Sequence, residues 1–491
     1  MLSGRFSFLN AEQKLAWPPK WNYDNLPRLW QYNLHYFDFL WNLEYEQAKC
    51  VVQSWIVNHR IGRAQVGWEP YPISVRLINW CAVFFAKYRP LTEVDQTFLP
   101  KLWGSIFLQT QWLIKNLEKH LLGNHYLENA AALAFAGSCF EGEYAANWLN
   151  MGIDILSEQI PEQILSDGLH FELSPMYHCR IMYVLALLLA TGNERLTDLL
   201  TNLLEKMCAA LKHMCHPDGD IALLNDSVFG VYHHPQQLLE YCGRLFGRDI
   251  SHVGYGDFAL PASGYYGWRG EDGDYIVCDA GKIGPDYIPG HAHADMFSFE
   301  LSLNGHRVIV DTGVYDYEIS ETRRYCRSTA AHNTVEIDGQ DQCEMWASFR
   351  VARRGYPRDV QWRPSEKGLS ISGWHNGYCR LRGRPVHHRK VEWDCESGLT
   401  VTDRITSSRA VNAVSRLHLH PTCTVVRMNE AGIEVEHPKG RVRITCPNGG
   451  IVRIEDGWYF PQFGLKERNK VLAFERSGTD FELRYCIQSE T

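Results

Sequence analysis

The 491-residue chain lacks the features that mark several large classes of protein. Its longest apolar run, 183–191, is far shorter than the ~20 residues that a membrane-spanning helix needs. Its 15 cysteines form no CxxC pairs and are odd in number, so we expect mostly buried, reduced thiols. It has no P-loop, no GxGxxG after a strand and no GxSxG, which argues against nucleotide enzymes and α/β-hydrolases.

An excess of basic residues is also missing. The chain has 49 Lys and Arg against 57 Asp and Glu, a net charge of −8, so no general attraction to nucleic acid is expected. The first residues lack the basic start and continuous apolar stretch of a secretory signal peptide. On sequence alone this favours a cytoplasmic location, or a periplasmic or secreted one if a leader has been removed.

Aromatic residues, by contrast, are abundant at 12%, and ten of the 16 tryptophans precede residue 150. Aromatic rings stack on sugar faces and also pack helices against one another. The excess therefore hints at a carbohydrate ligand without establishing one.

The hydrophobic periodicity changes along the chain and predicts two domains. Apolar residues recur at helical spacing through 97–120 and 195–215, and Ser174-Pro175 is typical of a helix start. From about residue 263 the pattern alternates with period two, and Asn304-Gly305 indicates a tight hairpin. We expect an α-helical domain over 1–250 and an antiparallel β-sandwich over 263–491, an α+β multidomain chain.

Three clusters carry residues suited to catalysis or metal binding. In Gly123–Asn129 we expect Asn124 to cap a helix, with His125 and Glu128 on one face of it, an arrangement that favours an anion. Tyr177 falls in the first turn of the helix that follows Ser174, where the helix dipole stabilises a phenolate that can act as acid or base. These readings compete with plain capping and with a core tyrosine.

The third cluster is the HxHxD sequence of His291, His293 and Asp295. On a strand these three side chains would share one face. Asp311 and His332 follow within about 40 residues, and two imidazoles with a carboxylate suit zinc. Structural histidines on a sheet are the alternative reading.

A basic group at Arg323, Arg324 and Arg327 suits an anionic substrate, since guanidinium forks pair with carboxylate or sulfate. A solvated loop is the alternative reading.

These clusters, in this order, resemble the heparinase II/III-like polysaccharide lyases over nearly the whole chain. The segments that carry the resemblance are 30–43, 68–80, 123–129, 167–178 and 290–335. The resemblance implies an N-terminal incomplete (α/α) toroid followed by a C-terminal antiparallel β-sandwich domain. It also implies β-elimination on a uronic-acid-containing glycan, glycosaminoglycan-like or exopolysaccharide, to give a 4,5-unsaturated uronate.

The family's functional residues carry over to matching positions. Asn124 and His125 resemble the groups that neutralise the substrate carboxylate, with Glu128 as a nearby substrate or orienting contact. Tyr177 resembles the family's acid/base, and His291 the base for the opposite stereochemistry.

The other expected contacts follow from the same motifs. The resemblance implies a structural divalent metal, zinc with calcium as the alternative, on His293, Asp311 and His332. The candidate substrate contacts are Trp30, Trp68, Arg323, Arg324 and Tyr315.

Two other functions fit part of the pattern. The first is a glycoside hydrolase on an (α/α) toroid, which needs two carboxylates across a cleft. The second is a cupin-like iron enzyme using His291, His293 and His332. The candidate carboxylates for a hydrolase are Glu69, Glu128 and Glu172.

If the chain is a lyase, we expect its partner to be an anionic polysaccharide or oligosaccharide.

Overall fold

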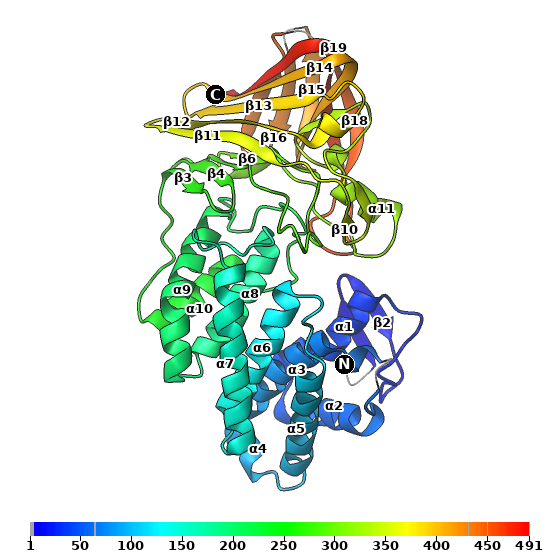
Figure 1. The fold of residues 1–491 in the computed structure, drawn as a ribbon, viewed down its shortest axis with the longest axis vertical. Helices are drawn as coiled ribbons and strands as arrows, with labels where there is room; N and C mark the ends of the chain where they lie inside the picture. The colour runs from blue at the N-terminus through cyan, green and yellow to red at the C-terminus, as the bar shows by residue number, and fades with distance from the viewer. Residues whose placement is uncertain (1–3, 63–64, 431, 449, 491) are drawn as a thin grey trace. The chain divides into compact units, whose positions relative to one another are not determined.

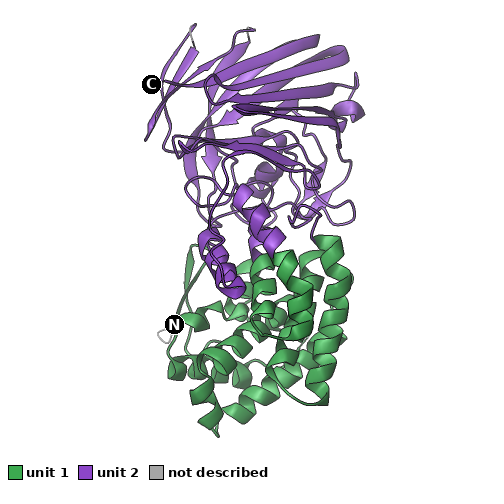
Figure 2. Ribbon diagram, turned by 90° about the vertical axis from the view of Figure 1, so that its left-hand side faces the viewer, with its two compact units in different colours: residues 1–163, 181–204 green, residues 164–180, 205–491 purple. Residues whose placement is uncertain are grey.

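The computed structural model describes residues 4–62, 65–430, 432–448 and 450–490. It divides into two compact units, coloured separately in Figure 2. Unit 1 comprises residues 1–163 and 181–204, and unit 2 comprises residues 164–180 and 205–491. Each unit is treated by itself below.

Unit 1 is helical, apart from a two-stranded ribbon near its start (Figure 1). The ribbon pairs β1 (Arg5–Phe8) with β2 (Ala11–Lys14). The helices that lie entirely within unit 1 are α1 (Arg28–Tyr36), α2 (Tyr45–Asn58), α3 (Pro70–Ala82), α4 (Arg89–Val94), α5 (Leu99–Lys115), α6 (Gly123–Cys139) and α7 (Glu143–Gln163).

Helix α6 is buried on all sides along most of its length. Its run of alanines lets a neighbouring helix approach closely, and α7 does so at Gly152. A Cβ on Gly152 would lie 2.5 Å from the backbone nitrogen of Ala134. This close packing fixes α6, and with it the polar residues of its first turn.

The remaining helices belong wholly or partly to unit 2. Helices α8 (Pro175–Leu189) and α9 (Glu194–His213) each contribute to both units, whereas α10 (Pro235–Phe246) and the short α11 (Glu321–Arg327) lie in unit 2. The helical periodicity therefore continues to about residue 246, as predicted. The compact units, however, divide the chain differently from the predicted ranges 1–250 and 263–491.

Unit 2 is dominated by antiparallel strands. A five-stranded sheet has the order β3-β4-β5-β6-β7, and a larger sheet has the order β11-β12-β13-β14-β19-β17-β16-β15, with β8 and β18 pairing at β14 and β19. The bounds are β3 (Gly256–Leu260), β4 (Tyr265–Arg269), β5 (Tyr275–Asp279), β6 (Phe299–Leu303), β7 (His306–Ile309), β8 (Val335–Ile337), β9 (Met345–Ala347), β10 (Arg350–Val351), β11 (Pro357–Ser365), β12 (Gly368–His375), β13 (Val386–Asp394), β14 (Gly398–His418), β15 (Thr424–Asn429), β16 (Gly432–His437), β17 (Gly440–Thr445), β18 (Ile451–Tyr459) and β19 (Glu467–Glu490).

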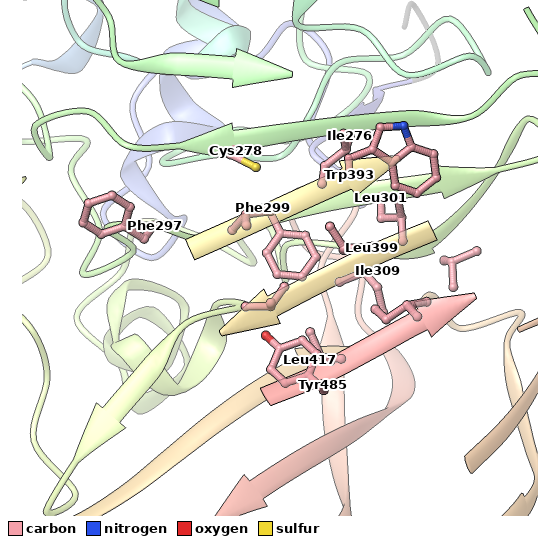
Figure 3. Close-up of a cluster of buried hydrophobic side chains, with 14 of the residues drawn as sticks. Ile276, Cys278, Phe297, Phe299, Leu301, Ile309, Trp393, Leu399, Leu417 and Tyr485 are labelled. Atoms are coloured by element: carbon pink, nitrogen blue, oxygen red, sulfur yellow. The ribbon is translucent and has the colours of Figure 1, made fainter. Parts of the chain in front are cut away.

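The two sheets share one hydrophobic core, which makes them a sandwich. Phe299 and Leu301 of the smaller sheet lie in the same buried cluster as Trp393, Leu399 and Tyr485 of the larger one (Figure 3). Apolar side chains from two facing sheets interdigitate in this way when alternate residues point inward. The prediction of an N-terminal helical region followed by an antiparallel sandwich is confirmed.

The predicted hairpin is present between β6 and β7. Asn304 and Gly305 have φ of 50° and 76°, and Leu303 pairs with His306. Positive φ at both central residues is the geometry of a type I′ turn, which asparagine and glycine tolerate best.

Two further expectations can be compared with the structure. Within the part of the chain that it describes, no helix has the length and apolar character to cross a membrane. All 15 cysteines are described, none forms a disulfide, and most are buried.

Candidate active site

Tyr177 is placed by the start of helix α8. The hydroxyl of Ser174 accepts a hydrogen bond from the backbone N–H of Tyr177 at 3.3 Å and donates to the carbonyl oxygen of Asp226 at 2.7 Å. Pro175 is the first helical residue. The predicted cap and the position of Tyr177 in the first turn are both confirmed, so the tyrosine lies near the positive end of the helix dipole.

The side chain of Tyr177 meets His291 and Tyr317. Its ring lies against the imidazole of His291, with ring centroids 4.0 Å apart at 30°. Its hydroxyl is 3.2 Å from the hydroxyl of Tyr317. A phenol and an imidazole are both side chains that can act as a general acid or base. The structure therefore brings together two residues that lie more than 100 positions apart in the sequence.

Carboxylates approach both ring nitrogens of His291. Nδ1 lies 2.8 Å from Asp226 Oδ2, and Nε2 lies 3.4 Å from Glu172 Oε2. The His291 side chain retains 15% of its exposure, whereas the two carboxylates are buried. The closer carboxylate, that of Asp226, is hydrogen-bonded to the imidazole and orients the ring.

Asp226 holds this arrangement together. Arg323 forms a bidentate pair with its carboxylate: Nη1 donates to Oδ1, and Nη2 donates to Oδ2 at 2.8 Å. His293 Nε2 lies 2.8 Å from Oδ1. Burial by itself raises the pKa of Asp226. The charge of Arg323 and the hydrogen bonds from Arg323, His291 and His293 outweigh it and hold that pKa well below its usual range. Asp226 is therefore ionised in the folded protein.

The HxHxD segment is a loop before β6 and not a strand. The expectation of a strand there is wrong, although the alternation survives, because Ala292 and Ala294 point into the hydrophobic core. The backbone N–H of His293 donates to Asn225 Oδ1 at 3.0 Å. Contacts of this kind with residues 225–226, and not a β-ladder, orient the histidines.

His293, Asp295 and His332 form a buried group with metal-ligand spacing. One ligand atom from each lies within 4.8 Å of the others. His293 Nδ1, His332 Nε2 and both oxygens of Asp295 have no hydrogen-bond partner among the described residues. Buried polar atoms are almost always satisfied, so atoms without a partner on three residues whose ligand atoms lie this close together fit a cation.

The opposite nitrogens of these two histidines are held by carboxylates. His293 Nε2 lies 2.8 Å from Asp226, and His332 Nδ1 lies 2.7 Å from Asp311 Oδ2. Carboxylates commonly orient ligating histidines in this way. The structure thus brings Asp295 into the group, and places Asp311 behind His332.

The Asn124 cluster lies in unit 1. Helix α6 begins at Gly123, so Asn124 is in the first turn and Leu122 occupies the cap; the prediction that Asn124 is the cap is wrong. The His125 ring stacks on Tyr71 at 4.3 Å, and its Nδ1 lies 3.0 Å from Glu118 Oε1. His125 keeps 29% of its side-chain exposure.

Two protein-family models match the chain. "Heparinase II/III N-terminus" matches residues 35–245, and "Heparinase II/III-like, C-terminal" matches residues 253–483. The chain belongs to the heparinase II/III-like family. Together the two matches account for most of both units.

Relatives of this heparinase II/III-like chain are known by name. A heparin-sulfate lyase of Bacteroides stercoris is 28% identical over 87% of this chain and 65% of its own length, and one of Pedobacter heparinus is 27% identical over 56% and 44%. The chain thus spans less than two thirds of the length of these relatives.

Solved structures of the family share the fold. A crystal structure of heparinase III has a TM-score of 0.78 at 19% identity, covering 96% of this chain and 79% of its own. A heparan sulfate lyase mutant of Pedobacter heparinus has a TM-score of 0.71 at 18% identity, covering 99% and 81%. The likeness extends over the helical toroid and the β-domain.

The two tryptophans expected to contact sugar are buried in this heparinase II/III-like chain. Trp30 is 2% exposed, packs edge-on against Phe8 and donates its indole N–H to Ala11, and Trp68 is 4% exposed between Trp55 and Trp112. The structure contradicts these two assignments, because neither ring has a face open to a sugar. Both tryptophans pack the core.

The other expected substrate contacts have different surroundings. Arg323 is 2% exposed and committed to Asp226, so it positions the site and is not an open clamp. Arg324 is exposed, with its guanidinium 3.4 Å from Glu321. Tyr315 is half-buried against Phe460.

Glu128 is fully buried and accepts a hydrogen bond from Tyr71 at 2.7 Å, which suits the orienting role. Tyr71 in turn supports the His125 ring.

Sequence reasoning missed Asp226 and Tyr317. It grouped Asp295 with His291 and His293, but the ligand set implied by the resemblance had Asp311 in place of Asp295. Asp226 stands in a largely apolar run, 221–228, where an ionised group is unusual without a partner. That contrast is the one sequence signal that would have singled it out.

Proposed function

We propose that the protein is a polysaccharide lyase that cleaves a uronic-acid-containing glycan by β-elimination. The contact between Tyr177 and the carboxylate-held His291 is the observation that carries the proposal most strongly. The likeness to heparin-sulfate lyases adds to it. Tyrosine and histidine can supply the proton transfers that an elimination needs, whereas glycoside hydrolysis canonically uses a pair of carboxylates.

The reaction needs three things from the protein. A base removes the proton on C5, whose electron pair becomes the C4=C5 double bond as the bond from C4 to its glycosidic oxygen breaks. An acid returns a proton to that oxygen. The C5 proton is acidic enough only when hydrogen bonds quench the charge of the adjacent carboxylate and stabilise the enolate-like transition state.

Each role has a candidate. Tyr177 serves as acid, and as base when the proton and leaving group lie on the same face of the sugar. His291 serves as base when they lie on opposite faces. Asn124 and His125 are the proposed neutralisers of the substrate carboxylate, a prediction that comes from the motif.

The proposed substrate is an anionic glycosaminoglycan of the heparan sulfate type, by analogy with the named relatives. A hydrolase reading finds less support. Glu128 is buried against Tyr71, and Glu69 is bonded to Tyr32 and Arg28. Such carboxylates are poorly placed as an acid and base pair across a bond.

We further propose that His293, Asp295 and His332 hold a divalent metal, with Asp311 orienting His332. Two imidazole nitrogens and one carboxylate favour zinc over calcium, which prefers oxygen ligands. A bound cation would fix the loop that carries His291 relative to the segment that carries His332. The cupin-like iron reading loses support, because His291 is engaged by Asp226 and Glu172, outside this group.

The direct test of the proposed chemistry uses Tyr177→Phe. The wild-type protein is expected to release products that absorb in the ultraviolet, from the new conjugated double bond, when given heparan sulfate. Tyr177→Phe should lower kcat by about 10²–10⁴-fold, the usual worth of a general acid or base, without unfolding the protein. The exposed Tyr255→Phe is the matched control and should be fully active. Equal activity in both variants would remove Tyr177 from the mechanism.

A further inference from the structure

The hairpin formed by β9 and β10 presents an unusually exposed tryptophan. Residues 344–353 form this hairpin, with Ala347 paired to Arg350. Met345 packs against the sandwich core, and Trp346, next along the strand and so on the opposite face, is 67% exposed. Phe349, at the turn of the same hairpin, is 42% exposed, so two aromatic side chains are open to solvent on this element and Trp346 is not a scattered single one.

The hairpin is anchored and does not depend on its own short ladder. Arg323 donates to the carbonyl of Ser348 from Nη2 at 2.8 Å and from Nε at 3.2 Å. Arg327 donates to the carbonyl of Ala347. Both guanidinium groups are buried, so the turn is held by charge-assisted hydrogen bonds in a sheltered place. Because these hydrogen bonds already hold the hairpin in one conformation, little conformational entropy is lost when a ligand binds to it.

The same anchors join the hairpin to the candidate catalytic residues. Arg323 binds Ser348 and Asp226, and Asp226 binds His291. The ring centroid of Phe349, at the turn, lies 6.1 Å from that of His291 and 5.2 Å from that of Tyr317. The hairpin is thus continuous with the Tyr177–His291 site inside unit 2.

The charge of the hairpin suits an anionic chain. Arg350 is exposed, and the described residues include no ion-pair partner for it. Arg353 and Glu344 pair with each other at 2.5 Å and contribute little net charge. An exposed indole and a guanidinium without an ion-pair partner among the described residues, both on one short hairpin, offer a stacking face for a sugar ring and a partner for its carboxylate or sulfate.

We infer that the β9–β10 hairpin is a glycan-binding platform, in which Trp346 stacks on a sugar ring of the bound chain and Arg350 pairs with an anionic substituent. This inference rests on the proposed function for the identity of the ligand. It assigns substrate binding to an element that the motifs did not single out. Trp346 takes the role expected of the buried Trp30 and Trp68.

The test measures binding separately from turnover. In a Tyr177→Phe background, which spares the substrate, the affinity for heparan sulfate is measured by titration calorimetry for the parent and for added Trp346→Ala, Trp346→Phe and Tyr255→Ala. Trp346→Ala should weaken binding about tenfold, the worth of one good aromatic contact, whereas Trp346→Phe should retain most of the affinity. Tyr255, 59% exposed, is the matched aromatic control and should bind as the parent does.

Kinetics on the otherwise wild-type enzyme give the second readout. Trp346→Ala should raise KM for the polymer about tenfold with kcat unchanged, the signature of lost uniform binding. Arg350→Gln should weaken binding at low salt and lose the difference at high salt. Melting temperatures should stay equal, since both side chains are exposed.

Two results would overturn the inference: unchanged affinity in Trp346→Ala, or no binding of heparan sulfate by the parent. Failure of the proposed function is a separate outcome. It would appear as glycan binding that depends on Trp346 with no unsaturated product from the wild-type enzyme.

Discussion

Replacing Asp226 by asparagine is the most informative single change, because the shape stays and only the charge leaves. The carboxylate is fully buried and serves Arg323, His291 and His293 together. Without it, the guanidinium of Arg323, 2% exposed, has no counter-charge. Breaking a buried pair from one side costs about 3–5 kcal/mol, so we expect the unfolding free energy to fall by about that amount.

Denaturant unfolding at neutral pH measures this loss. Asp480→Asn is the matched control, since its partner Arg404 lies at 3.0 Å with both side chains more than half exposed, and it should leave the unfolding midpoint unchanged. The double variant Asp226→Asn/Arg323→Gln should recover part of the stability, because no buried charge is left unpaired. It should not recover turnover, because His291 Nδ1 still lacks its carboxylate.

The pH dependence follows from the sign of the shift. The pKa of Asp226 is held below its unfolded value of about 3.9, so the ionised carboxylate stabilises the fold fully above that pH. The stability gap between wild type and Asp226→Asn should therefore be constant near neutral pH and shrink as pH falls below about 4. A difference in unfolding free energy between wild type and Asp226→Asn of less than about 1 kcal/mol at neutral pH would refute the claim that the Asp226 carboxylate holds Arg323, His291 and His293 in place.

Three other changes separate core, metal and electrostatic roles. Trp30→Ala should destabilise the protein by about 3–5 kcal/mol in denaturant unfolding, with KM unchanged in the folded enzyme; a raised KM at full stability would restore it as a sugar contact. His332→Ala should abolish bound zinc by elemental analysis and lower Tm, and chelation of the wild type should lower Tm similarly; an unchanged Tm with no metal in the wild type would remove the metal proposal. Burial raises the pKa of Glu300 to about 8, above its unfolded value of about 4.5, so wild-type stability should fall as pH rises between these values. Glu300→Gln should abolish that fall. Identical profiles of stability against pH in the two proteins would contradict the raised pKa of Glu300.

Local features of the fold could be read from the sequence. Periodicity separated helices from strands, Ser174-Pro175 marked the start of a helix, and Asn304-Gly305 marked a turn. Each of these depends on interactions within a few residues, where side-chain chemistry and backbone conformation are directly linked.

Long-range partners could not be read in the same way. In the sequence, Arg323 belongs to a basic group that predicts an exposed binding site for an anion. Only the tertiary structure shows that it binds Asp226, 97 residues earlier in the chain. Trp30 and Trp346 are the same residue type, yet one is 2% and the other 67% exposed. Motif membership drew attention to the buried tryptophan, and only the tertiary structure identified the exposed one.

The central claim is that bond cleavage proceeds by elimination. The most direct measurement compares, in one digest of heparan sulfate, the number of new reducing ends with the number of new conjugated double bonds seen by ultraviolet absorbance. Elimination predicts one double bond for every reducing end, and a loss of both together in Tyr177→Phe. New reducing ends without double bonds would contradict the account and identify the enzyme as a hydrolase.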